Sequence, residues 1–284
     1  MAGILLVTGA SGTVGAHLLR ELQAARVPLA AMSSRAAAMI EGVESRRADF
    51  NDPASLERAF AGVHTLFLLL PIVPNKLALA GNAIAAAQAA GVRHIVRSSG
   101  VGADAASPYA LMKLQGEIDA LVAASGIRYT LLRPVGFMQN YLTYQAAQVK
   151  SGTIYLPLGD ARQPLIDARD VAAAAARILR APDAHAGRTY NLTGAEALSQ
   201  HDVAAHLSQV LNRDIRYVPV SFEQANEAMR GMGMPPLLVE WMDSLNRYIV
   251  AGEGVDVSPH APALLGRSPI TFARFAGDHA AAWR

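Results

Sequence analysis

The sequence contains no cysteine in its 284 residues. Disulfide bonds, thiolate nucleophiles and cysteine-based metal sites are therefore excluded. Runs of lysine and arginine are also missing, and the formal net charge is only +2, so we expect no nucleic-acid partner. The eight histidines are scattered without a His-Glu-x-x-His segment, and we expect no bound metal.

Apolar runs long enough to cross a bilayer are absent too. Residues 66–73 and 77–90 are apolar, but Pro71, Pro74 and two polar residues interrupt them. The first residues lead straight into an apolar strand pattern, with no basic and apolar leader before it. These absences favour a cytoplasmic protein with no membrane partner.

What the chain does contain is a regular alternation of strand-like and helix-like segments. Continuous apolar runs occur at 4–7, 27–32, 65–70, 94–96 and 129–132, and helical patterns fill the intervals at 12–25, 53–61, 76–90 and 108–124. Strands without polar alternation are typical of a parallel sheet covered by helices on both faces. We therefore expect an α/β fold with a Rossmann-type, doubly wound parallel sheet.

The first strand and helix are joined by a glycine-rich turn, Thr8-Gly9-Ala10-Ser11-Gly12-Thr13-Val14-Gly15. In such turns one glycine allows a tight bend, one lets phosphates approach the backbone and one lets the helix pack on the strand. Free N–H groups and the positive helix end then attract an anion. We predict a pyrophosphate site made by Gly9, Ser11, Gly12, Thr13, Val14 and Gly15.

The end of the second strand indicates which dinucleotide binds. An NAD site usually has an acidic residue here, but the sequence reads Ala30-Ala-Met-Ser-Ser34-Arg35. Ser34 and Arg35 suit a ribose 2′-phosphate, so NADP (NADPH) is favoured over NAD. Further on, Asp49 and Phe50 are candidates for contact with the adenine, although Asp49 is equally suited to capping a turn.

A candidate proton donor lies at the start of the fourth helical pattern. Tyr109 and Lys113 are four residues apart, which places a phenol and an ammonium group on one helix face. A cation within about 4–6 Å favours the phenolate form of tyrosine. Ser98 and Ser99 follow a strand directly and are candidates to bind the same substrate oxygen. Tyr-x-x-x-Lys also occurs by accident on many helices.

Four motifs together resemble an atypical short-chain dehydrogenase/reductase of the NmrA-like family. They are the glycine turn, Ser98-Ser99-Gly100, Tyr109-x-x-x-Lys113 and Arg133-Pro134-x-Gly136-Phe137-Met138-x-Asn140. The resemblance implies NAD(P)H-dependent quinone or dye reductases as the nearest kin. It also implies roles for further residues: Lys113 holding the nicotinamide ribose, Leu69, Leu70 and Pro71 lining the cofactor path, and Pro134, Gly136 and Phe137 flanking the nicotinamide.

The chain changes character after Arg133, where prolines and glycines break it into short pieces. We expect a cofactor-binding domain at 1–133, joined by about 165–195, and a smaller C-terminal α/β substrate lobe at 134–164 and 196–284. An aromatic substrate would suit a lining of Phe137, Met138, Asn140, Tyr141, Met232 and Trp241. These side chains are equally suited to the core of the small lobe.

The sequence therefore predicts an NADP-dependent oxidoreductase that transfers hydride to a quinone-like or other carbonyl or aromatic acceptor. A quinone needs little proton help, so activity would survive the loss of the Tyr109 phenol. Two alternatives stay open: an NADP(H)-binding redox sensor without turnover, and a nucleotide-sugar epimerase or dehydratase. We expect a monomer or a homodimer with a small-molecule substrate.

Overall fold

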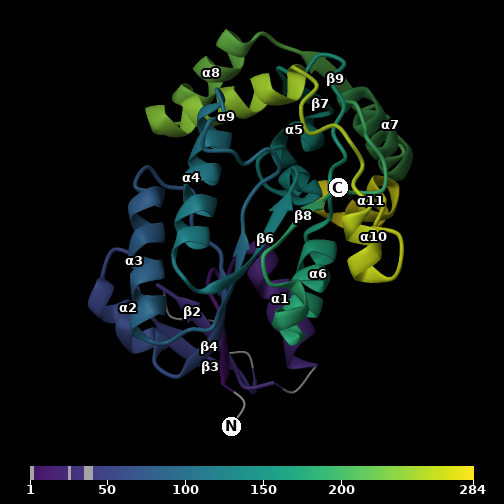
Figure 1. The fold of residues 1–284 in the computed structure, drawn as a ribbon. Helices are drawn as coiled ribbons and strands as arrows, with labels where there is room; N and C mark the ends of the chain where they lie inside the picture. Colours follow the sequence, from purple (N-terminus) through teal and green to yellow (C-terminus); the bar gives the residue numbers. More distant parts are fainter. Residues whose placement is uncertain (1–2, 25–26, 35–40) are drawn as a thin grey trace.

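The computed structural model describes residues 3–24, 27–34 and 41–284. A seven-stranded sheet of parallel neighbours runs through it, in the order β3-β2-β1-β4-β5-β6-β8 (Figure 1). The strand order reverses at β1, which is the switch point of a doubly wound sheet. The expected Rossmann-type fold is confirmed. The strands are β1 (Ile4–Val7), β2 (Leu29–Ser33), β3 (Glu44–Arg47), β4 (Val63–Leu68), β5 (His94–Ser98), β6 (Arg128–Pro134) and β8 (Arg188–Leu192).

Helices cover both faces of this sheet (Figure 1). One face carries α1 (Thr13–Gln23) and α6 (Ala168–Arg180). The other carries α2 (Pro53–Phe60), α3 (Lys76–Ala89) and α4 (Ala110–Ala124). Side chains alternate along each strand, so β1 sends Leu6 to one core and Leu5 and Val7 to the other. This burial on both faces explains the continuous apolar strand patterns.

A second, two-stranded parallel sheet pairs β7 (Thr153–Leu156) with β9 (Arg216–Pro219). Around a third core lie η1 (Met138–Leu142), α5 (Ala146–Ser151), α7 (Gln200–Leu211), α11 (Phe272–His279) and η3 (Ala280–Trp283). α8 (Phe222–Gly231) leads into α9 (Pro236–Val250), which packs on α4. Figure 1 shows α5, α7, α8, α9, β7 and β9 at the end of the molecule opposite the N-terminus.

The C-terminal segment does not stay within the small lobe. α10 (His260–Leu265) packs on α6 and β8, and its Ala261 and Leu264 are buried in the core beside α1. η2 (Pro182–His185) connects α6 with β8, which joins the sheet next to β6. The division into a cofactor-binding domain and a substrate lobe stays a prediction, with residues 260–265 on the domain side.

Several expected boundaries shift by one or two residues, and two of the shifts affect candidate site residues. The strand expected at 65–70 occupies Val63–Leu68, which leaves Leu69, Leu70 and Pro71 in the following loop. The helix expected from residue 108 begins at Ala110, because Tyr109 has an extended backbone with φ −91° and ψ 117°. Tyr109 is therefore the N-cap residue rather than part of the first helical turn.

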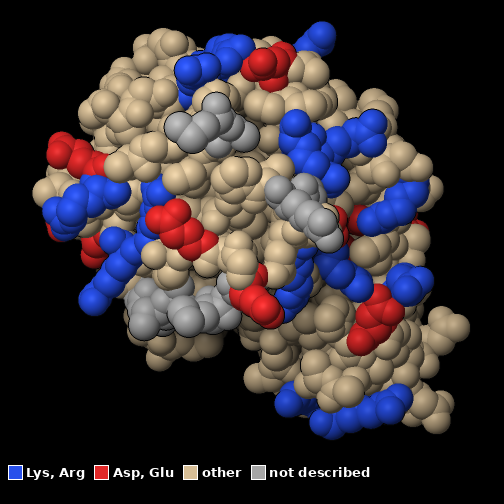
Figure 2. Space-filling view, turned by 90° about the horizontal axis from the view of Figure 1, so that it is seen from below, with Lys and Arg blue, Asp and Glu red and all other residues tan. Residues whose placement is uncertain are grey.

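Figure 2 shows the molecule from below, with acidic and basic side chains interspersed on that face. Within residues 3–24, 27–34 and 41–284, no helix combines the length and the apolar character needed to cross a bilayer.

Candidate cofactor and substrate site

The glycine turn has the geometry of a phosphate cradle. Gly9 has a φ of +62°, a conformation that favours glycine, and the N–H of Gly12 donates to its carbonyl oxygen at 2.9 Å. A Cβ on Gly15 would collide with the Gly9 carbonyl. The two glycines thus let the turn bend and let α1 approach it closely.

The first turn of α1 is available to an anion. Gly12 is its N-cap residue and makes no side-chain capping bond within the described part of the chain, and the first turn holds no acidic residue. Among the described residues, this first turn therefore offers its backbone N–H groups and the helix dipole no carboxylate of its own. This observation fits a dinucleotide pyrophosphate, which Gly12, Thr13 and their neighbours would hold.

Thr8 fixes the turn to the neighbouring strand β4. Its buried hydroxyl accepts the Leu69 N–H at 2.8 Å and lies 3.0 Å from the Phe67 carbonyl oxygen, to which it donates. A Cβ on Gly9 would lie 3.0 Å from the Leu69 side chain. The loop with Leu69, Leu70 and Pro71 is therefore held beside the glycine turn, at the crevice where dinucleotides bind in this fold.

The remaining expected cofactor residues lie at the same edge of the sheet, because all its strands are parallel. Ser98 ends β5, and Pro134 ends β6. The backbone beyond them stays paired, since the Val101 N–H donates to the Pro134 carbonyl oxygen at 3.0 Å. Gly136 and Phe137 follow, with Phe137 half-buried and bridged to Ile166. The structure thus brings the β1, β4, β5 and β6 segments together.

The residues expected around the adenosine differ in position and burial. Ser34 directly follows β2, whereas Arg35 lies outside the described residues. Phe50 is buried in the core under α2 and α3. Asp49 is exposed, and its Oδ1 accepts the backbone and side-chain N–H groups of Asn51 at 2.8 and 3.0 Å. Asp49 therefore acts as a turn cap, and adenine contact by either residue stays a prediction.

Tyr109 and Lys113 have different surroundings. The Tyr109 ring is half-buried and packs edge-on against Tyr248, with centroids 5.3 Å apart, whereas Lys113 is exposed. Within residues 41–284, no hydrogen bond joins the Tyr109 phenol to Lys113. Tyr109 is the N-cap residue with an extended backbone, and its carbonyl oxygen accepts the Lys113 N–H at 2.9 Å. A joint role of the two side chains stays a prediction.

Ser99 belongs to a buried charged cluster. Its hydroxyl donates to Asp119 Oδ2 at 3.0 Å, and the Arg133 Nη2 donates to the same oxygen at 2.8 Å. Arg97, 1% exposed, forms an ion pair with the other oxygen of Asp119. Ser98 points to the opposite face of the sheet, since successive strand residues alternate. The Ser99 hydroxyl therefore serves the link between β5, β6 and α4.

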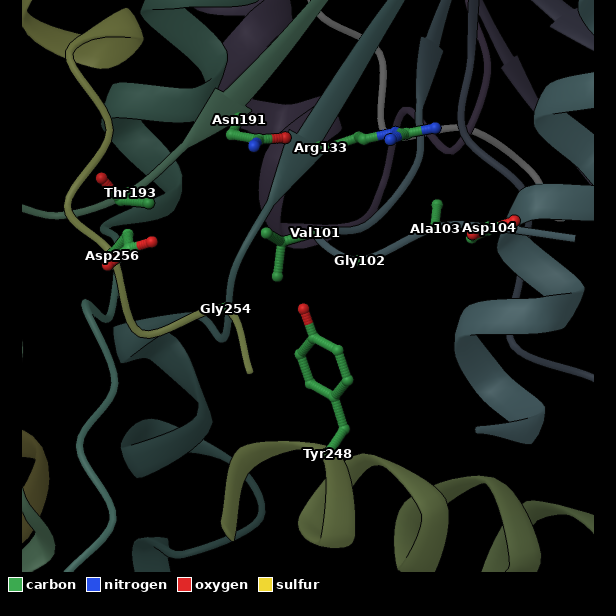
Figure 3. A pocket seen from close by; sticks show the side chains of 10 residues that line it. All are labelled: Val101, Gly102, Ala103, Asp104, Arg133, Asn191, Thr193, Tyr248, Gly254 and Asp256. Carbon is green, nitrogen blue, oxygen red and sulfur yellow. The ribbon is translucent and has the colours of Figure 1, made fainter. Parts of the chain in front are cut away.

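A cavity of about 410 Å³ lies at the carboxyl ends of β5, β6 and β8. Figure 3 shows the Tyr248 hydroxyl pointing into it from α9, with Arg133 and Asn191 on the opposite side. Burial raises the pKa of Tyr248, which keeps the phenol protonated. The full lining is Val101, Gly102, Ala103, Asp104, Arg133, Asn191, Thr193, Tyr248, Gly254 and Asp256.

None of the six expected substrate residues lines this cavity. Met138, Tyr141 and Trp241 are 2%, 3% and 5% exposed and lie in the cores. Tyr141 also donates from its hydroxyl to Gln200 Oε1 at 2.6 Å. Met232 is 76% exposed on the surface, and Asn140 is half-buried. Met138 and Tyr141 thus lie in the core of the expected small lobe, as the alternative had it, whereas Trp241 lies in the core between the large sheet, α3 and α4.

The sequence interpretation missed Tyr248, Asp104 and Asp256 as cavity residues. Arg133 belongs to the motif at residues 133–140 quoted above, and it is the direct register partner in β6 of Asn191 in β8. Their alternation with apolar residues such as Leu132 and Leu192 was the available signal. No local pattern identifies Tyr248, because it reaches the cavity only through the packing of α9 on α4.

The NmrA-like family model matches residues 1–256. The chain belongs to this family. An NAD(P)H azoreductase of Xenophilus azovorans is 39% identical to this NmrA-like chain over 284 residues, which cover 99% of each protein. The resemblance seen in the sequence is thereby confirmed.

Two solved structures of NADPH or NADP(H) complexes are similar to this NmrA-like protein along almost its whole length. One is the NADPH-dependent quinone oxidoreductase QOR2 of Escherichia coli with NADPH, at 30% identity and a TM-score of 0.85, covering 97% of this chain and 99% of that one. The other is the triphenylmethane reductase of Citrobacter sp. with NADP(H), at 27% identity and a TM-score of 0.82, covering 96% and 99%.

Proposed function

We propose that this NmrA-like protein is an NADPH-dependent reductase of quinone-like or related aromatic acceptors. The observation that carries the proposal is the glycine turn, with the uncapped N-terminus of α1 directed at the carboxyl edge of the sheet. Its relatives include an azoreductase and a quinone oxidoreductase that use the same class of cofactor. The proposed cofactor, acceptor class and reaction type therefore agree with those in the names of these relatives.

The protein's own groups bind and orient the reactants. Bound NADPH supplies a hydride, and a quinone takes up this hydride and a proton to give the hydroquinone. The turn from Gly9 to Gly15 holds the pyrophosphate, and the Leu69 and Pro134 loops border the path of the nicotinamide. Reduced quinones accept protons readily from water, so no buried acid is required at the acceptor. We therefore assign no obligatory proton transfer to Tyr109 or Lys113.

The polarity of the cavity argues against a nucleotide-sugar substrate. It contains one guanidinium, from Arg133, and two carboxylates, from Asp104 and Asp256. A nucleoside diphosphate would meet repulsion from the carboxylates and only one cation. A reductase activity is therefore preferred to that of an epimerase or dehydratase. We also propose that the protein is cytoplasmic and is a monomer or a homodimer.

The test is the absorbance decay of NADPH in the presence of purified protein and a panel of quinones, azo compounds and aldehydes, with NADH in parallel. We expect turnover with quinones or azo compounds and a preference for NADPH. Tight NADPH binding without oxidation by any acceptor would support a redox sensor instead and overturn the reductase. A preference for NADH would overturn the choice of NADPH.

A further inference from the structure

The strand β3 brings a cation beside the end of β2. β2 and β3 are parallel and in register, with Met32 opposite Arg46 and Ser33 opposite Arg47. The pairing continues one residue further, because the Ala48 N–H donates to the Ser33 carbonyl oxygen at 3.2 Å. Arg47 therefore ends its strand at the carboxyl edge, where the adenosine ribose of a dinucleotide lies in this fold.

The two arginines of β3 point to opposite faces of the sheet. Arg46 donates from Nη1 to the carbonyl oxygens of Ala59 and Ala61 at 2.6 and 2.8 Å, which places it on the α2 face. Side chains alternate along a strand, so Arg47 lies on the other face. That face also carries Ala31, whose side chain packs in the core with α1.

Arg47 thus shares both an edge and a face with the N-terminus of α1. Two strand spacings separate β3 from β1, about 10 Å in total. The adenosine half of a dinucleotide covers this distance when its pyrophosphate rests on α1. Arg47 is exposed, and within the described ranges it makes no hydrogen bond or ion pair, whereas Arg46 is held by Glu44 and two carbonyls.

We propose that Arg47 binds the ribose 2′-phosphate and is a determinant of NADPH over NADH. The inference rests on the proposed NADPH function and adds a residue to it. A guanidinium suits this role because it forms charge-assisted hydrogen bonds with phosphate oxygens. Asp49, two residues further along, has Oδ1 engaged by Asn51 and is held in its turn.

The test is calorimetric binding of adenosine 2′,5′-bisphosphate and of 5′-AMP, which differ only in the 2′-phosphate and need no turnover. Arg47→Ala should weaken binding of the bisphosphate about tenfold, the size expected for one partly exposed charge-assisted bond. Binding of 5′-AMP should stay unchanged. Arg47→Lys should retain part of the preference, and raised salt should reduce it.

Arg58→Ala is the matched control, since it removes an exposed charge from the last turn of α2 and should affect neither ligand. The inference is overturned if Arg47→Ala changes bisphosphate binding less than about twofold, or if it weakens 5′-AMP equally. If the unsubstituted protein shows no preference for the bisphosphate over 5′-AMP, the proposed preference for NADPH is itself wrong. Circular dichroism of each variant separates these results from unfolding.

Discussion

Tyr109 and Tyr248 pack edge to face, with ring centroids 5.3 Å apart and ring planes at 88°. Tyr109 is the N-cap residue of α4, and Tyr248 belongs to α9 and lines the cavity, so the contact joins α4 with α9 beside the cavity. Aromatic pairs of this kind contribute about 0.5–1.5 kcal/mol beyond their buried area. The position of Tyr109 therefore has a structural explanation independent of proton transfer.

Tyr109→Phe should retain quinone reductase activity, because it keeps the ring contact and removes only the hydroxyl. Steady-state kinetics should show kcat and kcat/KM close to those of the unsubstituted protein. Tyr109→Ala should lower the melting temperature. A loss of about 100-fold or more in kcat for Tyr109→Phe is the size expected of a general acid and would restore its catalytic role.

Gly15→Ala should disrupt the phosphate cradle, since the new methyl group would collide with the Gly9 carbonyl. Forced overpacking of this kind costs about 1–3 kcal/mol, and NADPH binding should weaken at least as strongly. Urea unfolding and fluorescence titration measure the two effects. Gly81→Ala is the control: a Cβ there would meet nothing within 4 Å, and α3 should gain up to about 1 kcal/mol. Equal stability and equal NADPH binding of the two variants would contradict the role of Gly15 in the phosphate cradle.

Asp119→Asn should destabilise the protein by about 3–5 kcal/mol, because it removes the anion that Arg97 and Arg133 share. Ser99→Ala removes only one hydrogen bond to that carboxylate and should cost about 1 kcal/mol. Denaturant unfolding of both variants gives the comparison. A Ser99→Ala protein that is fully stable but loses turnover would show that Ser99 has a catalytic role.

Lys76 should make stability depend on pH. It is 4% exposed at the start of α3, and burial, with a smaller effect of Arg97, lowers its pKa from 10.5 to about 8. The unfolded chain then binds the proton more tightly, so stability should rise as pH increases from about 8 to 10.5. Below pH 8 the penalty is complete, and Lys76→Met should stabilise the protein by about 2–3 kcal/mol.

Urea unfolding at several pH values between 7 and 10.5 measures this effect. The difference between Lys76→Met and the unsubstituted protein should shrink as pH rises. The exposed Lys113→Met variant, measured in parallel, is the control for replacing a surface lysine by methionine. A constant difference across the range would mean that Lys76 titrates normally in the folded protein.

The sequence predicts the parts of the site that depend on the backbone. The glycine turn, the parallel sheet and the loop after β4 follow from local patterns. Buried strands and helices each have a characteristic spacing of apolar residues, and a tight turn has glycines. Strand ends are less well defined: Leu69 and Leu70 extend the apolar run but lie beyond Leu68, where β4 ends.

Side-chain partners are the part that the sequence does not predict. Ser99 follows a strand like a catalytic serine, yet Asp119, twenty positions away, accepts its hydroxyl. The spacing of Tyr109 and Lys113 fits a helix face, but the helix begins one residue after Tyr109. The position of Arg47 beside the end of β2 follows only from its register with Ser33. Each case depends on tertiary packing, which no local period encodes.

The reaction proposed for this protein is direct hydride transfer from bound NADPH to an aromatic acceptor. Its most direct test is a single-turnover experiment, in which the protein with bound NADPH is mixed rapidly with a quinone and the nicotinamide absorbance is followed. We predict fast oxidation within the complex, slowed when the transferred hydrogen of NADPH is replaced by deuterium. Stable NADPH absorbance in the presence of every quinone, with the cofactor still bound, would contradict the account.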